Sequence, residues 1–259
     1  MAKVSEHSVW VRTLSVLSPL SLLLLWEVLA RWHIIDVRLF SSPSLIIGSF
    51  VPLLLSGELL YNTVVSVQRV VLGFLAGSLP GILIGMSMGL SPLVRSAIEP
   101  MIAATYPIPK LAVMPLILLV FGLGETSKVF TVAIGVFYLV VINTMAGVLN
   151  IDRIYIDVAK NFGASRKDFY LTVAFPGALP MIFAGLKLGM GMALILIVAA
   201  EMSAAKAGVG WMIWRAYDMF DIEQMFVALM TLSILGYIFS LILDWLEGWV
   251  LPWKQQSRQ

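Results

Sequence analysis

The sequence predicts an all-α membrane protein with six transmembrane helices, and two observations carry this prediction. First, 60% of the 259 residues are hydrophobic and only 12% are charged, too few to cover the exterior of a soluble domain. Second, the apolar residues form long runs, each near the roughly 20 residues that cross a bilayer core of about 30 Å. The runs lack the period-two alternation of a membrane β-barrel. We therefore expect residues 1–259 to form a single transmembrane domain.

The first predicted span covers roughly residues 13–30 and is followed by a short helix on the membrane surface. Residues 28–30 weakly resemble a signal-peptidase site, but five further spans follow, and we expect the first span to be retained. Ser42 followed by Pro43 is typical of a helix start, because proline suits the first helical position. The apolar stretch at 45–55 is short for a span and predicts an interfacial helix.

The second predicted span, residues 63–90, carries a glycine at every fourth position. Such glycines stack on one helical face, the pattern of close helix–helix contact, and they are Gly73, Gly77, Gly81, Gly85 and Gly89. We expect this face to pack inside the subunit, with a seam between two copies as the alternative. Arg69, near the start of the span, is expected to snorkel to the interface.

The third predicted span, residues 98–121, contains prolines at positions 100, 107, 109 and 115. Because proline removes a backbone donor and clashes with the preceding turn, four of them predict a broken helix. Broken helices at membrane depth are tolerated where they face protein or a water-filled path. Tyr106, Pro107, Pro109 and Lys110 are thus candidates for a translocation pathway. The alternative is a structural kink with Lys110 snorkelling.

Three further spans are predicted at residues 128–149, 181–200 and 225–250. A tight glycine turn at 122–125 precedes the first of them. The segment 201–224 holds six charged residues and is expected to form a polar loop.

The distribution of positive charge predicts the orientation in the membrane. Six spans place both termini on one side. If that side is the cytoplasm, 11 of the 17 Lys and Arg residues lie on inner segments and 6 on outer ones. The positive-inside rule favours this arrangement. It places residues 150–180, the longest polar interruption of the chain, in the cytoplasm.

Residues 150–180 predict a helix, a glycine turn and a second helix. Either Asn150 or Asp152 is suited to cap the first helix, which would run to Phe162. Gly163 fits the left-handed position that ends helices.

The second helix of this segment has its own start and stop signals. Ser165 with Asp168 resembles a capping box, and Pro176 is expected to break the helix after Ala174. A solvated helical hairpin is one interpretation of the segment, and a slim projection that docks on a partner protein is the other.

The same segment resembles the cytoplasmic loop of ABC-importer permeases. The motif of that family is Glu-Ala-Ala, three residues, Gly, nine residues and Ile-x-Leu-Pro. Here Asp157-Val158-Ala159 takes the first triplet, Gly163 follows at the required spacing, and residues 173–176 fill the closing positions. The first triplet departs from the motif at two positions, and the closing group departs at its first position, with Val173 for Ile, and at its third, with Phe175 for Leu.

Further stretches between residues 62 and 246 are similar to the nitrate, sulfonate and taurine branch of these permeases. They are Tyr106-Pro-Ile-Pro-Lys-Leu-Ala, Met114-Pro-Leu, Phe121-Gly-Leu-Gly-Glu, Gly185-Leu-Lys-Leu, Ala199-Ala-Glu-Met and Gly208-Val-Gly. The resemblance implies a type I ABC-importer permease fold with a cytoplasmic coupling helix, in a bacterial inner membrane.

The resemblance also implies partners and site residues. Such a permease works as a pair, here expected to be a homodimer in membrane lipid, with two cytoplasmic ATPase subunits that bind ATP-Mg and an external solute-binding protein. The chain itself would bind no cofactor, metal or nucleic acid, catalyse no reaction, and lacks the phosphate-loop motif. The implied ATPase-coupling residues are Asp157, Ala159, Lys160, Gly163, Ala164, Ser165 and Arg166.

The substrate implied by the resemblance is a small anion such as nitrate, a sulfonate, taurine or bicarbonate. Lys110 and Lys187 are candidates to attract it, and Glu201 completes the candidate pathway. A secondary transporter without an ATPase is the rival function, although no clear internal repeat is present. An intramembrane enzyme is disfavoured because the H-E-x-x-H and G-x-S-x-G motifs are missing.

Overall fold

The computed structural model describes residues 2–253, without the side chains of residues 2–13, 15 and 16. All the regular secondary structure in that part of the chain is helical, as the sequence predicts. Four charges counted on the inner side lie outside the described side chains, namely Lys3, Arg12, Lys254 and Arg258. The described chain divides into two compact units.

One unit comprises the chain up to Tyr61 together with Met212–Met230. It holds α1 (Ala2–Arg31), α2 (Val37–Phe40) and α3 (Pro43–Leu55). Ser42 caps α3 by accepting from the Leu45 amide, with Pro43 at the helix start, which confirms the predicted start signal. Glu27 of α1 accepts hydrogen bonds from the amide and hydroxyl of Ser44 at 3.0 and 2.9 Å, which ties α1 to α3.

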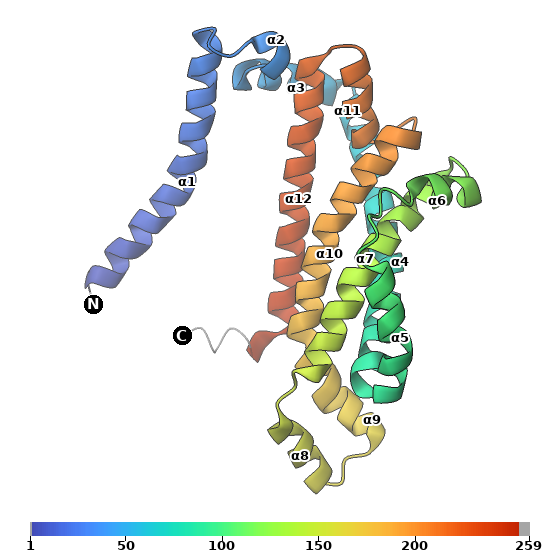
Figure 1. Ribbon diagram of the computed structural model, residues 1–259. Coiled ribbons are helices and arrows are strands. Elements are labelled where there is room, and N and C mark those ends of the chain that lie inside the picture. The colour runs from blue at the N-terminus through green and yellow to red at the C-terminus, as the bar shows by residue number, and fades with distance from the viewer. Residues whose placement is uncertain (1, 254–259) are drawn as a thin grey trace. The chain divides into compact units, whose positions relative to one another are not determined.

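The other unit comprises Asn62–Trp211 and the chain from Thr231 onward. The remaining helices, some of which continue into the first unit, are α4 (Glu58–Leu90), α5 (Pro92–Thr105), α6 (Met114–Phe121), α7 (Glu125–Leu149), α8 (Arg153–Asn161), α9 (Arg166–Phe169), α10 (Phe175–Ala204), α11 (Val209–Asp218) and α12 (Ile222–Val250). In Figure 1, α7 and α10 run side by side, and α8 and α9 lie at one end of this pair.

Four described helices are long and apolar enough to cross a membrane: α4, α7, α12 and the continuous helix Arg166–Ala204. The third predicted span is divided between α5 and α6, as its prolines indicated. The count of six spans therefore stays a prediction.

Glycines of α4 form a close seam with α7 inside this unit. A Cβ atom at Gly73 would lie 2.5 Å from the Cβ of Val132, and one at Gly85 would lie 2.7 Å from the Cβ of Thr144. The other three glycines of the series also face α7. Packing within the subunit, the favoured interpretation of the glycine series, is confirmed, because these positions have no room for another chain.

Helix α10 packs on α7 through small residues as well. A Cβ at Gly185 of α10 would lie 2.8 Å from the Cβ of Asn143, and one at Gly147 of α7 would lie 2.8 Å from the Cβ of Met181. Because α7 is contacted by both neighbours, Val132, Val136 and Val140 are fully buried in the core.

Replacing Gly85 by alanine is expected to destabilise the protein by about 1–3 kcal/mol, because the new methyl group forces α4 and α7 apart. Gly191→Ala is the matched control, since a Cβ there meets nothing within 4 Å. Thermal unfolding of the two purified variants in detergent measures the difference. Equal unfolding temperatures for the two variants would contradict the close α4–α7 seam.

The break expected at Pro176 is wrong. The capping box at Ser165 starts α9, but the chain then passes through a π-helical turn, Tyr170–Ala174, straight into α10. A π-turn shifts the hydrogen-bonding register just before Pro176, the residue that has no N–H to donate. Pro176 thus stands in the first turn of α10, where a missing donor is tolerated.

The polar loop expected at 201–224 is also wrong. Residues up to Ala204 belong to α10, a short turn follows, and Val209–Asp218 is the helix α11. Helix α12 then begins at Ile222. Four of the six charged residues in this stretch therefore lie on helices, and one of them, Glu201, is fully buried, whereas Lys206 and Asp221 lie in the turns between the helices.

Candidate functional site

Residues 150–180 have the predicted helix–glycine–helix form. Asp152, rather than Asn150, caps α8 by accepting from the Ile154 amide at 3.1 Å. Gly163 has a φ of +69°, in the left-handed region that favours glycine. The Gly163 amide donates to the Lys160 carbonyl and the Ala164 amide to the Ala159 carbonyl, both at 3.0 Å. This pair of bonds is the Schellman motif, which satisfies the last carbonyls of the helix.

The predicted coupling residues differ in exposure. Ala159 is buried, whereas Asp157, Lys160, Gly163, Ala164, Ser165 and Arg166 are exposed. The Ser165 hydroxyl accepts from the Asp168 amide, and the Asp168 carboxylate accepts from the Ser165 amide, so both are held in the capping box. The slim turn is therefore fixed by local hydrogen bonds.

Phe162 is the feature of this turn that sequence reasoning missed. Its side chain stands beside Gly163 and is 87% exposed. Tyr155 of the preceding helix is also exposed. The available signal was an aromatic residue next to a helix-ending glycine in a polar segment. An exposed aromatic group at the tip of a projection is typical of a protein-binding surface.

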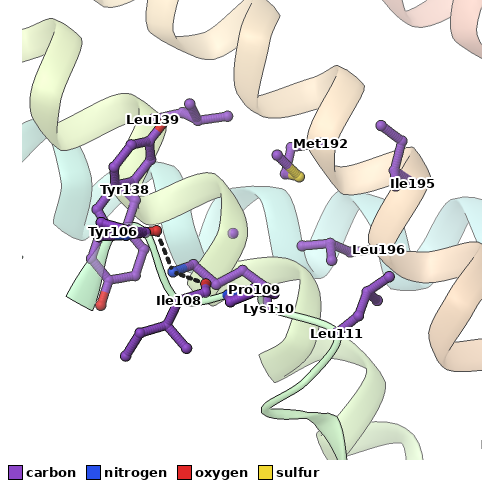
Figure 2. Close-up of a pocket in the computed structure, with 12 residues that line it drawn as sticks. Tyr106, Ile108, Pro109, Lys110, Leu111, Tyr138, Leu139, Met192, Ile195 and Leu196 are labelled. Carbon is purple, nitrogen blue, oxygen red and sulfur yellow. Dashed lines mark hydrogen bonds between the residues drawn. The ribbon is translucent and has the colours of Figure 1, made fainter.

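The break in the third predicted span opens a cavity of about 410 Å³, shown in Figure 2. Four candidate pathway residues line it together, namely Tyr106, Pro107, Pro109 and Lys110. The opposite walls come from α7 and α10 and include Tyr138 and Leu196. The structure thus gathers the four residues of the proline-rich stretch in one place.

The Lys110 side chain bridges carbonyl groups of the helix break. Its Nζ donates to the carbonyls of Thr105, Tyr106 and Ile108, each at 3.0 Å, and lies 4.1 Å from the ring centre of Tyr138. Carbonyl groups neutralise no charge, and no ion pair of Lys110 occurs among the described residues. The cavity therefore carries one net positive charge on an otherwise mainly apolar wall.

Lys187 and Glu201 do not line this cavity. Lys187 of α10 forms ion pairs with Asp244 and Glu247 of α12, the latter at 2.5 Å. Its positive charge is thus compensated by two carboxylates.

Glu201 is fully buried and binds Arg69. The Arg69 guanidinium donates to Glu201 at 2.8 Å and to the Ala207 carbonyl at 2.7 Å, and it pairs with Glu125 at 2.5 and 2.6 Å. Arg69 is only 5% exposed, so the interpretation that it snorkels to the interface is wrong. The Arg69 guanidinium is held by the carboxylates of Glu125 and Glu201 and does not extend to the membrane interface.

The turn that follows α10 is fastened to the same cluster. The amides of Gly208, Val209 and Gly210 donate to Asn62, Ser66 and Glu201, respectively, at 2.7 to 2.9 Å. Gly208 has a φ of +123°, and a Cβ there would overlap the Glu201 carboxylate.

This buried polar network unites three stretches on which the resemblance rested: Glu125 ends the first, Glu201 belongs to the second, and Gly208 starts the third. Their proximity was not predicted. Within the described residues, no group of three or more His, Asp or Glu is arranged to hold a metal ion.

Comparisons with known proteins agree with these features. Residues 81–255 match the family described as the binding-protein-dependent transport system inner membrane component. The chain is 32% identical over 246 residues to the taurine transport system permease protein TauC of Escherichia coli, covering 93% of this chain and 90% of that protein. It is 31% identical to the putative aliphatic sulfonates transport permease protein SsuC of Bacillus subtilis, covering 95% and 88%.

Two further similarities concern nitrate import and the fold. The chain is 32% identical over 198 residues to the nitrate import permease protein NrtB of Leptolyngbya laminosa, covering 76% of this chain and 71% of that protein. A chain from a crystal structure of the MetNI methionine ABC transporter superposes with a TM-score of 0.66 at 15% identity, covering 76% of this chain and 97% of that one. The two chains share a fold.

Proposed function

Because this chain belongs to the binding-protein-dependent transport system inner membrane components, the permeases of ABC importers, we propose that it couples to a separate ATPase through residues 150–180. Its relatives are permease proteins, so the chain is a multi-pass inner-membrane transport subunit rather than an enzyme. The observation that carries the coupling proposal is the rigid, projecting turn at Gly163 with Phe162 exposed at its tip. In this proposal the turn enters a groove of the ATPase and Phe162 is its apolar anchor.

The proposed pathway passes the cavity at the helix break between α5 and α6. Its support is the cavity of about 410 Å³ and the uncompensated charge of Lys110. A positive charge on an apolar wall favours a small anion, which agrees with relatives named for taurine, sulfonates and nitrate. The pathway proposal rests on Tyr106, Pro107, Pro109 and Lys110, since Lys187 and Glu201 have carboxylate and guanidinium partners elsewhere.

The proposed assembly follows the family. Two copies of the permease, with six spans each and cytoplasmic termini, bind two ATPase subunits that carry ATP-Mg and receive solute from an external binding protein. Both compact units belong to one permease domain, residues 1–259, with residues 150–180 as its coupling loop. The α4 glycines are occupied by α7, so the two copies meet through other surfaces.

Co-purification tests the coupling proposal. The tagged chain, co-expressed with the ATPase subunit of its transporter, is expected to retain that subunit, and Phe162→Ala is expected to weaken the association by about 2 kcal/mol, the loss typical of a buried aromatic anchor. Leu123→Ala is the control: Leu123 is also exposed, at 70%, but precedes α7, whereas residues 150–180 follow it. Equal retention of the ATPase by both variants would contradict the anchor.

Uptake measurements separate the proposed function from a secondary transporter. An ATP-driven importer is inhibited by vanadate, whereas a secondary transporter is not. Vanadate-insensitive uptake by the chain without any ATPase would favour the secondary transporter.

A further inference from the structure

We propose that a second cavity, between the coupling loop and the end of α4, binds a phosphate-bearing anion, either the headgroup of an anionic lipid or free phosphate. We call it the loop cavity. It has a volume of about 520 Å³, and its lining includes Leu90, Ser91, Lys160, Ser165, Arg166 and Tyr170. It is separate from the cavity at the helix break. Lys160, Ser165 and Arg166 are also among the implied coupling residues, so binding is tested on the permease without an ATPase.

The charge of the loop cavity is positive and uncompensated. Lys160 and Arg166 both line it, and neither side chain has an ion pair within residues 2–253. No carboxylate is among the lining residues. The two nearest along the chain are Asp157, which lies outside the lining, and Asp168, which is held by Ser165 in the capping box.

The neutral groups of the lining suit phosphate oxygens. Ser91 caps α5 by accepting from the Val94 amide, which leaves its own hydroxyl proton free to donate. Tyr170, which carries a second hydroxyl group, also lines the cavity. Two cations and two hydroxyl donors form the donor set that phosphate groups prefer.

The surroundings of the loop cavity favour a lipid as the source of the phosphate. Leu90 ends α4 and lines the cavity, and both Leu90 and Leu93, at the start of α5, are exposed. The apolar side chains would contact the acyl chains of a lipid, and the two cations beside them would bind its headgroup. Basic cavities at the ends of membrane helices bind anionic headgroups by this combination. A bound headgroup would join α8 and α9 to the α4–α5 turn and brace the coupling loop.

The test is lipid binding by the purified full-length permease, measured by native mass spectrometry during titration with phosphatidylglycerol. Lys160→Gln with Arg166→Gln is expected to weaken this binding about 30-fold, the loss of two charge contacts. Arg153→Gln with Lys167→Gln is the matched control, because it removes the same charge from exposed positions of the same loop outside the cavity. The control is expected to bind as the wild type does.

The outcomes decide between site, source and surface charge. An equal loss in both double variants, or no loss in either, overturns the proposal, because the binding would then follow net charge or lie elsewhere. Titration with inorganic phosphate alone identifies the source. If phosphate binds saturably and the Lys160→Gln/Arg166→Gln variant does not bind it, the ligand is a free anion. If phosphatidylglycerol binds but inorganic phosphate does not, the ligand is the lipid. Because no ATPase is present, a failed coupling proposal would leave this result unaffected.

Discussion

Glu201→Leu is expected to destabilise the protein by about 3–5 kcal/mol, the largest single loss that this structure predicts. The substitution leaves the buried Arg69 guanidinium with one carboxylate partner in place of two. It also leaves the Ser66 hydroxyl and the Gly210 amide without their acceptor. A buried donor that loses its acceptor keeps its full cost of desolvation. Thermal unfolding of the purified permease measures the effect.

Glu125→Gln provides the matched comparison for Glu201. Both carboxylates bind the same guanidinium, but Glu201 is fully buried and the side chain of Glu125 is 65% exposed. We expect Glu125→Gln to cost only about 1 kcal/mol, because water compensates an exposed partner. Combining Glu201→Leu with Arg69→Met is expected to restore part of the stability, since the buried guanidinium that lost a partner is then removed. Equal losses for Glu201→Leu and Glu125→Gln would show that burial does not set the strength of the network.

Gly163→Val is expected to leave the permease folded and to abolish most of its transport and its stimulation of ATP hydrolysis. Open space surrounds this position, so a side chain there meets no steric clash. The effect comes from the backbone, because a φ of +69° costs a β-branched residue about 1–2 kcal/mol. The Schellman bonds of α8 are then lost and the turn changes direction. Uptake and ATP hydrolysis by the reconstituted complex measure the result.

Gly163→Asn distinguishes conformation from size at this position. Asparagine adds a larger side chain than alanine but tolerates the left-handed region. We expect it to retain most of the transport. If asparagine and valine impair transport equally, the turn tolerates no side chain at this position, and the left-handed backbone is not the reason for the glycine. Normal uptake by a well-expressed Gly163→Val variant would refute the coupling role of the glycine.

The helical membrane class, the glycine face of the second predicted span and the helix–glycine–helix form around Gly163 could all be predicted from the sequence. Each of these depends on composition or on residues a few positions apart. Asp152 and Ser165 cap helices through amides two and three residues away, and Gly163 ends one by its own backbone conformation. A glycine at every fourth position likewise fixes one helical face. Such interactions are complete within a short segment, so a local pattern predicts them.

The roles of Arg69, Glu201 and Pro176 became clear only in the folded chain. Arg69 and Glu201 are 132 positions apart, and each alone resembles a charged residue near the end of a span. In the sequence Pro176 resembles a helix stop, but in the structure a π-turn precedes it and the helix continues. For Arg69 and Glu201 the physical reason is that the free energy of a buried charge is set by the partners that the folded chain brings to it, and those partners lie far away in the sequence. For Pro176 the reason is the local change of hydrogen-bonding register in the π-turn Tyr170–Ala174, which the residue types alone do not reveal.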